Sequence, residues 1–320
     1  MLRYRLIFGS IMMAALVGVF YFDDQLDQIN IRGTWLGQLF PNRSYLPAGL
    51  LLLASFMVLI ALGSKELCAI FRAKGVPANP VMVAMAGIVG LMLIYTLPHT
   101  LDSQTTMAIF ASLMVLVFVA TLVEHSWLGR TEGAVLVAGV TMFALIYMGL
   151  LPGFYLAIRR WHSAWVIAAI MIVTKSCDIG AYFTGLAIGR HRLIPWLSPA
   201  KTWEGLLGGV AFSAITAVGL AALLNGLDLA GVYSSDQGQR VFNAYHYPLW
   251  AAAAAGVLIG AVGQFGDLCA SLFKRDAGVK DAGSTIPGFG GVLDIVDSPI
   301  VVAPVAYWLL ALARLAGQEG

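Results

Sequence analysis

The chain has 320 residues, of which 59% are hydrophobic and 11% are charged. Because soluble domains carry about 25% charged residues, this composition excludes an ordinary soluble protein and indicates a membrane protein. The net charge of +2 is too small to indicate nucleic acid or an acidic protein as a partner.

Apolar runs long enough to cross a bilayer recur along the whole chain. A hydrocarbon core about 30 Å thick requires about 20 apolar residues as helix, because a helix satisfies its own backbone where water is absent. We predict about nine spans, at residues 5–22, 47–63, 80–98, 105–123, 133–157, 163–187, 205–225, 248–270 and 293–314. The expected fold is an all-α, polytopic transmembrane helical bundle. Because no small-residue cleavage site precedes Asp23, we expect the first run to be an uncleaved helix.

Lysine and arginine gather in alternate loops, and this pattern predicts the orientation of the chain. Three basic loops should face the cytoplasm with the N-terminus, and their cations are Lys65, Arg72 and Lys74, then Arg190, Arg192 and Lys201, then Lys274, Arg275 and Lys280. The loop at residues 226–247 should be external. Arg159 and Arg160 are an exception, because the alternation places both of them outside.

Charged residues within apolar runs are confined to the second half of the chain, and the interiors of the first five spans contain none. The residues concerned are Lys175, Asp178, Asp267, Asp294 and Asp297. A charge in hydrocarbon costs at least about 2.5 kcal/mol, so such residues usually line a cavity or a site. Lys175 and Asp178, three residues apart, could instead neutralise each other. We therefore divide one membrane domain into an N-terminal scaffold with a potential oligomer interface, residues 1–160, and a C-terminal catalytic half, residues 161–320.

The last basic loop and the two helices beside it contain the groups that phosphoryl or nucleotidyl transfer requires. Asp267, Ser271 and Lys274 share one helical face, because they are spaced by four and three residues. A glycine-rich loop follows, and Asp294 and Asp297 then share a face of the next helix. Carboxylates bind Mg²⁺, which bridges phosphates, and cations neutralise a polyphosphate. The polar loop of a transporter has a similar composition, so composition alone does not distinguish the two.

The order of these residues resembles the signature of the phosphatidate cytidylyltransferases, also called CDP-diacylglycerol synthases. The matching residues are Ser271, Lys274-Arg275, Lys280-Asp281, Pro287-Gly288, Gly290-Gly291, Leu293-Asp294 and Asp297-Ser298. A second block matches upstream, with Asp178-Ile-Gly-Ala-Tyr-Phe, Gly189-Arg190, Ser198-Pro-Ala-Lys-Thr-Trp-Glu-Gly205 and Gly208-Gly209. The resemblance covers residues 174–304, and it extends over the N-terminal half only as a hydrophobic pattern.

The resemblance implies that CTP and phosphatidate react to give CDP-diacylglycerol and pyrophosphate in phospholipid biosynthesis. It implies Mg²⁺, with a second cation as a further option, held by Asp267 and Asp294. The implied catalytic residues are Ser271, Lys274, Arg275, Lys280, Asp281 and Asp297, and the implied substrate-binding residues are Asp178, Arg190, Ser198, Lys201, Gly290 and Gly291. We expect the active site on the cytoplasmic side of a bacterial-type inner or plasma membrane, and by analogy a homodimer. Membrane lipid is an expected partner, and nucleic acid is not.

Two positions depart from the family pattern. Phe289 stands where the family has His, and Ile295 stands where it has Arg. Neither side chain forms hydrogen bonds, so a proton shuttle and a phosphate-binding fork are missing. Three readings follow: a divergent active synthase, a relative with another substrate, and an inactive paralogue. A CTP-dependent lipid kinase and a transporter or scaffold without chemistry are the alternatives from other functional classes.

Overall fold

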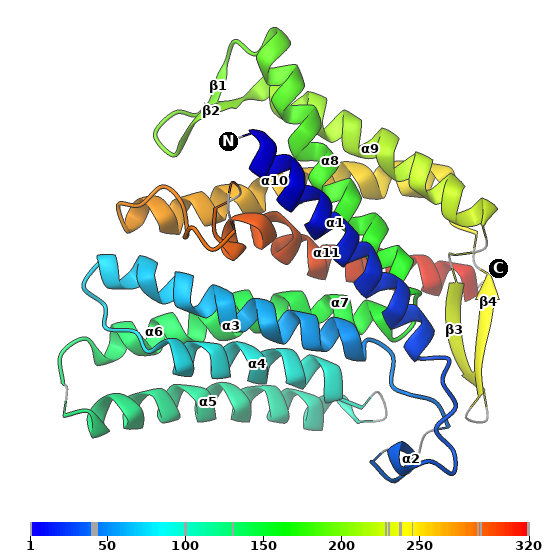
Figure 1. The fold of residues 1–320 in the computed structure, drawn as a ribbon, viewed down its shortest axis with the longest axis horizontal. Coiled ribbons are helices and arrows are strands. Elements are labelled where there is room, and N and C mark those ends of the chain that lie inside the picture. Colours follow the sequence, from blue (N-terminus) through cyan, green and yellow to red (C-terminus); the bar gives the residue numbers. More distant parts are fainter. Residues whose placement is uncertain are drawn as a thin grey trace.

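The computed structural model describes residues 2–39, 44–98, 101–129, 131–227, 229, 231–236, 239–244, 246–286, 288 and 290–318. Its helices are α1 (Leu2–Leu26), α2 (Trp35–Leu39), α3 (Leu50–Ala73), α4 (Pro80–Thr96), α5 (Ser103–Trp127), α6 (Ala134–Ala144), η1 (Leu145–Leu150), α7 (Leu151–Arg159), α8 (Ala164–Ile188), α9 (Trp203–Gly226), α10 (Leu249–Asp276) and α11 (Val292–Gln318). Two antiparallel pairs accompany them, β1 (Arg192–Ile194) with β2 (Ser198–Thr202) and β3 (Gly231–Asp236) with β4 (Gln239–Ala244). The long helices lie side by side in one bundle (Figure 1).

Each of the nine predicted apolar runs lies in a helix. Seven of the described helices are long and apolar enough to cross a membrane, and they comprise α3, α5, the continuous α6–η1–α7, α8, α9, α10 and α11. The helix α4 has only 17 residues, and α1 also falls outside the seven. The prediction of an all-α membrane bundle is confirmed, and the predicted count of about nine spans roughly agrees. The two hairpins were not predicted.

The span at residues 134–159 is one continuous helix whose middle, η1, has π-helical geometry. Pro152 is the second residue after this segment, and proline lacks the N–H that a regular helix would donate to the carbonyl of residue 148. A π-helical turn accommodates this missing backbone hydrogen bond. Gly149 brings η1 against α4, since a Cβ there would collide with the carbonyl oxygen of Gly87. The irregular middle of this span is therefore packed tightly in the bundle.

Small residues bring α8, α9 and α10 close together. A Cβ on Gly209 would lie 2.6 Å from the carbonyl oxygen of Cys177, and one on Gly256 would lie 2.7 Å from the Cα of Ala214. The hydroxyl of Ser213 donates to the carbonyl of Gly256 at 2.8 Å. Close approach of backbones at small residues is typical of helix packing in membranes. It holds α8, which carries Lys175 and Asp178, and α10, which carries Asp267, close to α9.

The basic loops gather at one end of the bundle. Lys74, after α3, forms a 2.5 Å ion pair with Asp276 at the end of α10. The β1–β2 hairpin and the start of α11 lie toward the same side in Figure 1, whereas α2 and the β3–β4 hairpin lie toward the other. This arrangement agrees with the alternation of loops that the sequence predicts.

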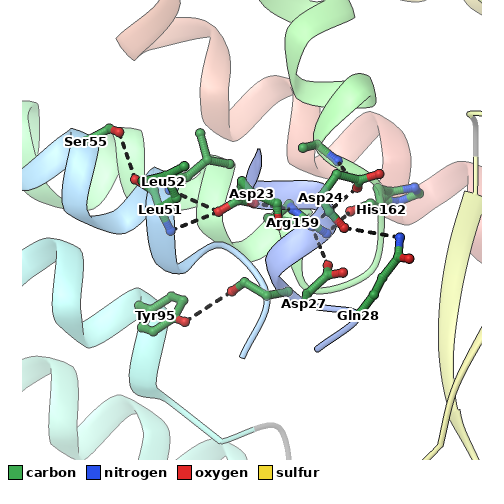
Figure 2. Close-up of polar contacts among 12 residues, drawn as sticks. Asp23, Asp24, Asp27, Gln28, Leu51, Leu52, Ser55, Tyr95, Arg159 and His162 are labelled. Carbon is green, nitrogen blue, oxygen red and sulfur yellow. Dashed lines mark hydrogen bonds and ion pairs between the residues drawn. The ribbon is translucent and has the colours of Figure 1, made fainter. Parts of the chain in front are cut away.

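Arg159, one of the two exceptions to the charge pattern, is fully buried among acidic residues (Figure 2). Its Nε donates to Asp23 Oδ2 at 2.7 Å, and its Nη2 pairs with Asp27 and lies 3.4 Å from Asp24 Oδ1. We call Asp23, Asp24, Asp27 and Arg159 the Arg159 cluster. Arg160, the other exception, donates to carbonyls at the end of α4, among them Leu97 at 2.9 Å. Arg159 is therefore neutralised by acidic residues, and Arg160 caps the end of α4. Neither is a free charge in a loop.

The Arg159 cluster also joins α1 to the beginnings of two other helices. Asp23 Oδ1 accepts hydrogen bonds from the backbone N–H groups of Leu51 and Leu52, at 3.0 and 3.1 Å. Asp24 Oδ1 accepts one from Ala164 N at 3.2 Å. A carboxylate at a helix N-terminus satisfies free N–H groups and opposes the helix dipole. The cluster therefore anchors α1 to α3 and α8.

Candidate active site

Two lysines from separate elements form ion pairs with carboxylates of α10 and α11. Lys201 on β2 places its Nζ 2.5 Å from Asp267 Oδ2 on α10. Lys274, in the last turn of α10, places its Nζ 2.8 Å from Asp294 Oδ1 in the first turn of α11. The first pair connects the upstream block of the predicted signature, which contains Lys201, to Asp267, which lies on α10 four residues before the downstream block begins at Ser271.

Lys175 and Asp178 extend this arrangement into α8. Their side chains are 3.4 Å apart, and Lys175 Nζ also lies 3.8 Å from Asp297 Oδ1 on α11. Gln264 on α10 donates to Asp178 Oδ1 at 2.6 Å. Lys175 therefore pairs with Asp178 within α8 and also lies near Asp297 of α11. The structural reading of this pair and the site reading are compatible. We call Lys175, Asp178, Lys201, Gln264, Asp267, Lys274, Asp294 and Asp297 the lysine–carboxylate network.

Within the network, Asp267 of α10 and Asp297 of α11 are neighbouring carboxyl groups from different helices. The two groups lie within hydrogen-bonding reach of each other. Asp297 is only 3% exposed, and its Oδ1 accepts from the backbone N–H and the hydroxyl of Ser298, at 2.7 and 3.2 Å. Two neighbouring carboxylates away from bulk water repel unless a proton or a cation lies between them. This pair is therefore the position in the network most suited to a bound cation.

Asp294 has a different environment, because its carboxylate closes the glycine-rich turn. It accepts hydrogen bonds from the backbone N–H groups of Ala282 and Gly291, each at 2.9 Å to Oδ2, in addition to Lys274. Gly290 has φ +96°, and a Cβ there would lie 2.9 Å from Asp294 Oδ2. A side chain at Gly290 would thus be strained and would crowd the carboxylate. As arranged, Asp294 fixes the turn before α11.

Glu66 of α3 also holds this turn, and no sequence motif marks it. Its carboxylate accepts from the backbone N–H groups of Val292 and Leu293, at 2.9 and 3.0 Å, and from the hydroxyl of Thr285. A Cβ on Gly291 would lie 2.6 Å from Glu66 Oε2. The predicted span ended at residue 63, but α3 continues to residue 73, and Glu66 is followed by the apolar residues 67–71. An acidic residue between two apolar segments of one helix is the signal that could have identified it.

Several predicted site residues lie outside the network. Arg190, Arg275, Lys280 and Asp281 are exposed, and Ser198 and Ser271 are half-buried. Among the residues that the structure describes, none of these six side chains joins an ion pair of the network. The backbone N–H groups of Gly290 and Gly291 bond within the turn, to Ile286 and Asp294. The positions of Pro287 and Phe289 lie outside the described residues, and Ile295 is half-buried in the first turn of α11.

Comparison with known proteins decides the family. The family model described as "Cytidylyltransferase family" matches residues 31–313, which is most of the chain. This chain belongs to the cytidylyltransferase family. Its membership makes the chain a nucleotidyltransferase, and the resemblance read from the two sequence blocks is confirmed.

Curated members of the cytidylyltransferase family align along nearly their whole length. The phosphatidate cytidylyltransferase of Bacillus subtilis (strain 168) is 30% identical over 269 residues, which cover 80% of this chain and 89% of that protein. The protein of the same name from Synechocystis sp. is 29% identical over 292 residues, covering 81% and 88%. The one from Staphylococcus aureus (strain COL) is 30% identical over 261 residues, covering 82% and 89%. The similarity therefore extends well beyond the signature blocks.

The network can be tested for its fit to a divalent cation. Among the described residues, no group of three or more His, Cys, Asp or Glu side chains is arranged to hold a metal ion. Mg²⁺ in nucleotide-handling proteins usually takes only one or two carboxylates and completes its shell with phosphates and water. Asp267 and Asp297, on adjacent helices, supply two such oxygen donors. The donor set fits Mg²⁺ that arrives with a nucleotide, and it does not resemble a closed protein cage.

Proposed function

We propose that this chain transfers the cytidylyl group of CTP to phosphatidate, giving CDP-diacylglycerol and pyrophosphate. The observation that carries the proposal is the 2.5 Å pair of Lys201 with Asp267, because it joins the upstream signature block to α10, the helix on which the downstream block begins. The printed names of the aligned relatives support phosphatidate as the acceptor.

The chemistry requires little from the protein beyond positioning and charge balance. The phosphate oxygen of phosphatidate is already anionic, so no protein nucleophile is needed. This oxygen attacks the α-phosphorus of CTP, a new phosphorus–oxygen bond forms, and the bond to the bridging oxygen of the β-phosphate breaks. Lys201 and Lys274 lie beside the carboxylates and offset the charge of the phosphates. Glu66 and Asp294 hold the turn that borders the site.

The proposed cofactor is Mg²⁺, held by Asp267 and Asp297. When bound, it stabilises negative charge on the phosphate oxygens. Lysines pair with the same two carboxylates, Lys201 with Asp267 at 2.5 Å and Lys175 with Asp297 at 3.8 Å. Asp294, which the resemblance implies as a ligand, already accepts three hydrogen bonds and serves chiefly to fix the turn. The second cation and the homodimer stay predictions.

The proposed location of the site is the cytoplasmic side of a bacterial-type inner membrane. The end of the bundle that carries the network also carries the basic loops, as the pair of Lys74 with Asp276 illustrates. Loops rich in lysine and arginine are retained on the cytoplasmic side. Labelling of a Lys280→Cys variant with a membrane-impermeant maleimide tests this. Inside-out vesicles should react, and reaction only in right-side-out vesicles would reverse the assignment.

The central experiment incubates purified protein with phosphatidate, Mg²⁺ and CTP labelled at either the α- or the γ-phosphate. Cytidylyl transfer moves the α-label into the lipid fraction and releases the γ-label as pyrophosphate. A lipid kinase would move the γ-label into the lipid instead, and a transporter or scaffold would move neither. Asp297→Asn serves as the inactive control. Appearance of the γ-label alone in the lipid would refute the proposed reaction.

A further inference from the structure

Tyr147 lies in the π-helical segment η1, and no motif of the sequence marks it. Its side chain is 5% exposed, and its hydroxyl is buried without a hydrogen-bond partner among the residues that the structure describes. A buried polar group without a partner costs about 1–3 kcal/mol. Helical segments with π geometry are rare and frequently occur at functional sites. The hydroxyl therefore calls for an explanation other than folding.

The ring of Tyr147 is fixed by two aromatic neighbours. Phe143 stacks on it with centroids 5.1 Å apart and planes at 12°, and Phe273 meets it edge-on at 5.6 Å and 79°. A phenylalanine at position 147 would make both contacts without burying a hydroxyl. Packing thus accounts for the ring and leaves the hydroxyl unexplained.

The unpartnered hydroxyl is beside the lysine–carboxylate network. The helix α11, which carries Asp294 and Asp297, contacts η1. Both carboxylates, together with Cys269 and Asp267, act electrostatically on the phenol oxygen, and Asp297 has the largest effect among them. Phe273, which holds the ring, directly precedes Lys274 on α10. The hydroxyl is therefore a free donor next to the pair of carboxylates that fits a cation.

Tyr155, in α7 of the same span, shows the contrasting case. It is also buried, at 1% exposure, but its hydroxyl donates to the carbonyl oxygen of Pro299 at 2.9 Å. This bond ties α7 to α11, which is an ordinary structural role for a buried tyrosine. The two buried tyrosines of this span thus differ in whether the hydroxyl has a hydrogen-bond partner.

We propose that Tyr147 is a positioning residue for the divalent cation. Its hydroxyl donates a hydrogen bond to the carboxylate of Asp297 when Asp297 and Asp267 together hold the cation. Donors to a metal-binding carboxylate fix its orientation, and their loss typically costs about 10–100-fold in metal affinity or activity. The inference rests on the proposed function, because the proposed function supplies the cation.

The test compares Tyr147→Phe with Tyr155→Phe in the purified full-length protein in detergent. Mn²⁺ is the probe, because the electron paramagnetic resonance of the free ion reports binding without CTP or lipid. We expect Tyr147→Phe to weaken Mn²⁺ binding about 10-fold. Without the ion, its melting temperature should be equal to that of the wild type or higher, since an unpaired buried hydroxyl is gone. Tyr155→Phe should melt lower and bind Mn²⁺ normally.

Three results would overturn the inference, and they are distinguishable. Equal Mn²⁺ affinity of Tyr147→Phe and the wild type would separate the hydroxyl from the cation. A Tyr147→Phe protein that melts lower or fails to fold would assign the hydroxyl a structural bond instead. A wild-type protein that binds no Mn²⁺ would remove the proposed cation site as well, whereas the first two results would leave the proposed function intact.

Discussion

Two groups of buried or half-buried ion pairs stand out among the residues that the structure describes, and they are built differently. The Arg159 cluster uses one arginine whose side chain is 0% exposed, set against three aspartates. The lysine–carboxylate network uses three lysines, and its pair of Lys201 with Asp267 retains contact with solvent, since 19% and 32% of these side chains are exposed. The first group is closed around a fully buried cation, whereas the second has an accessible cation and carboxylate.

This difference separates a structural role from a site. The guanidinium of arginine is a rigid fork that stays charged, which suits a permanent buried pair with several acceptors. Lysine is a flexible point charge that can move from a carboxylate to a phosphate. Asp23 and Asp24 also accept hydrogen bonds at the N-termini of α3 and α8. Asp267 of α10 and Asp297 of α11 instead lie close to each other. We therefore expect substitutions in the first group to affect stability and those in the second to affect activity.

The largest expected effect is on catalysis, at Asp267. Asp267→Asn should lower the rate of cytidylyl transfer at least about 1,000-fold, because it removes a proposed cation ligand worth several kcal/mol. The free energy of unfolding should change by about 1 kcal/mol or less, since the pair with Lys201 is partly solvated. Asp276→Asn is the matched control, an exposed carboxylate on the same helix. A rate within about 10-fold of the wild type at Asp267→Asn would contradict the assignment.

At Arg159 we expect the opposite result, a loss of stability without a loss of catalysis. Arg159→Met should lower the free energy of unfolding by about 3–5 kcal/mol, because it leaves three carboxylates without their buried cation. Denaturation in detergent measures this, and the activity per folded molecule should not change. Adding Asp23→Asn and Asp27→Asn to the same protein should restore most of the loss. A variant with normal stability and reduced turnover would erase the proposed distinction between the two groups.

An intermediate effect is expected where the N-terminal half touches the site. Glu66→Gln replaces an acceptor of three hydrogen bonds by an amide that must place a donor against one of them. We expect turnover to fall about 100-fold through displacement of the turn, and the free energy of unfolding to fall by about 1–3 kcal/mol. Glu124→Gln is the control, because Glu124 bonds only to Asn79 in the described contacts. Equal effects of the two substitutions would argue against a positioning role.

The smallest effect is a pH dependence beside the Arg159 cluster. Burial, together with the charge of Arg314, lowers the pKa of His162 from 6.5 to about 4. The folded protein therefore binds fewer protons than the unfolded chain between these values, and stability is lost as the pH falls below 6.5. At pH 5.5 the loss from this group should be about 1.4 kcal/mol. Comparing denaturation of the wild type with that of His162→Asn at pH 7.5 and 5.5 measures it, and an identical pH dependence would exclude His162 as the source.

Much of the site could be predicted because its residues follow one another in two compact blocks. The order of Lys274, Asp294 and Asp297 resembles a known signature, and the structure brings all three into one network. Glu66 and Tyr147 could not be found in this way, because both reach the site from the N-terminal half of the chain and neither belongs to a motif. Gln264 lies only three residues before Asp267, but its contact with Asp178 depends on how α8 and α10 pack. The two exceptional arginines had no explanation from sequence, because their partners are in other helices.

The sequence by itself determined the solvent of this protein, its helical spans and its family, since hydropathy and an ordered motif are local properties of a chain. Only the tertiary structure decided which charges are sealed and which are accessible. That distinction depends on which helices pack together. The same aspartate anchors a bundle when an arginine is buried against it, and is suited to bind a cation when it meets a second carboxylate instead.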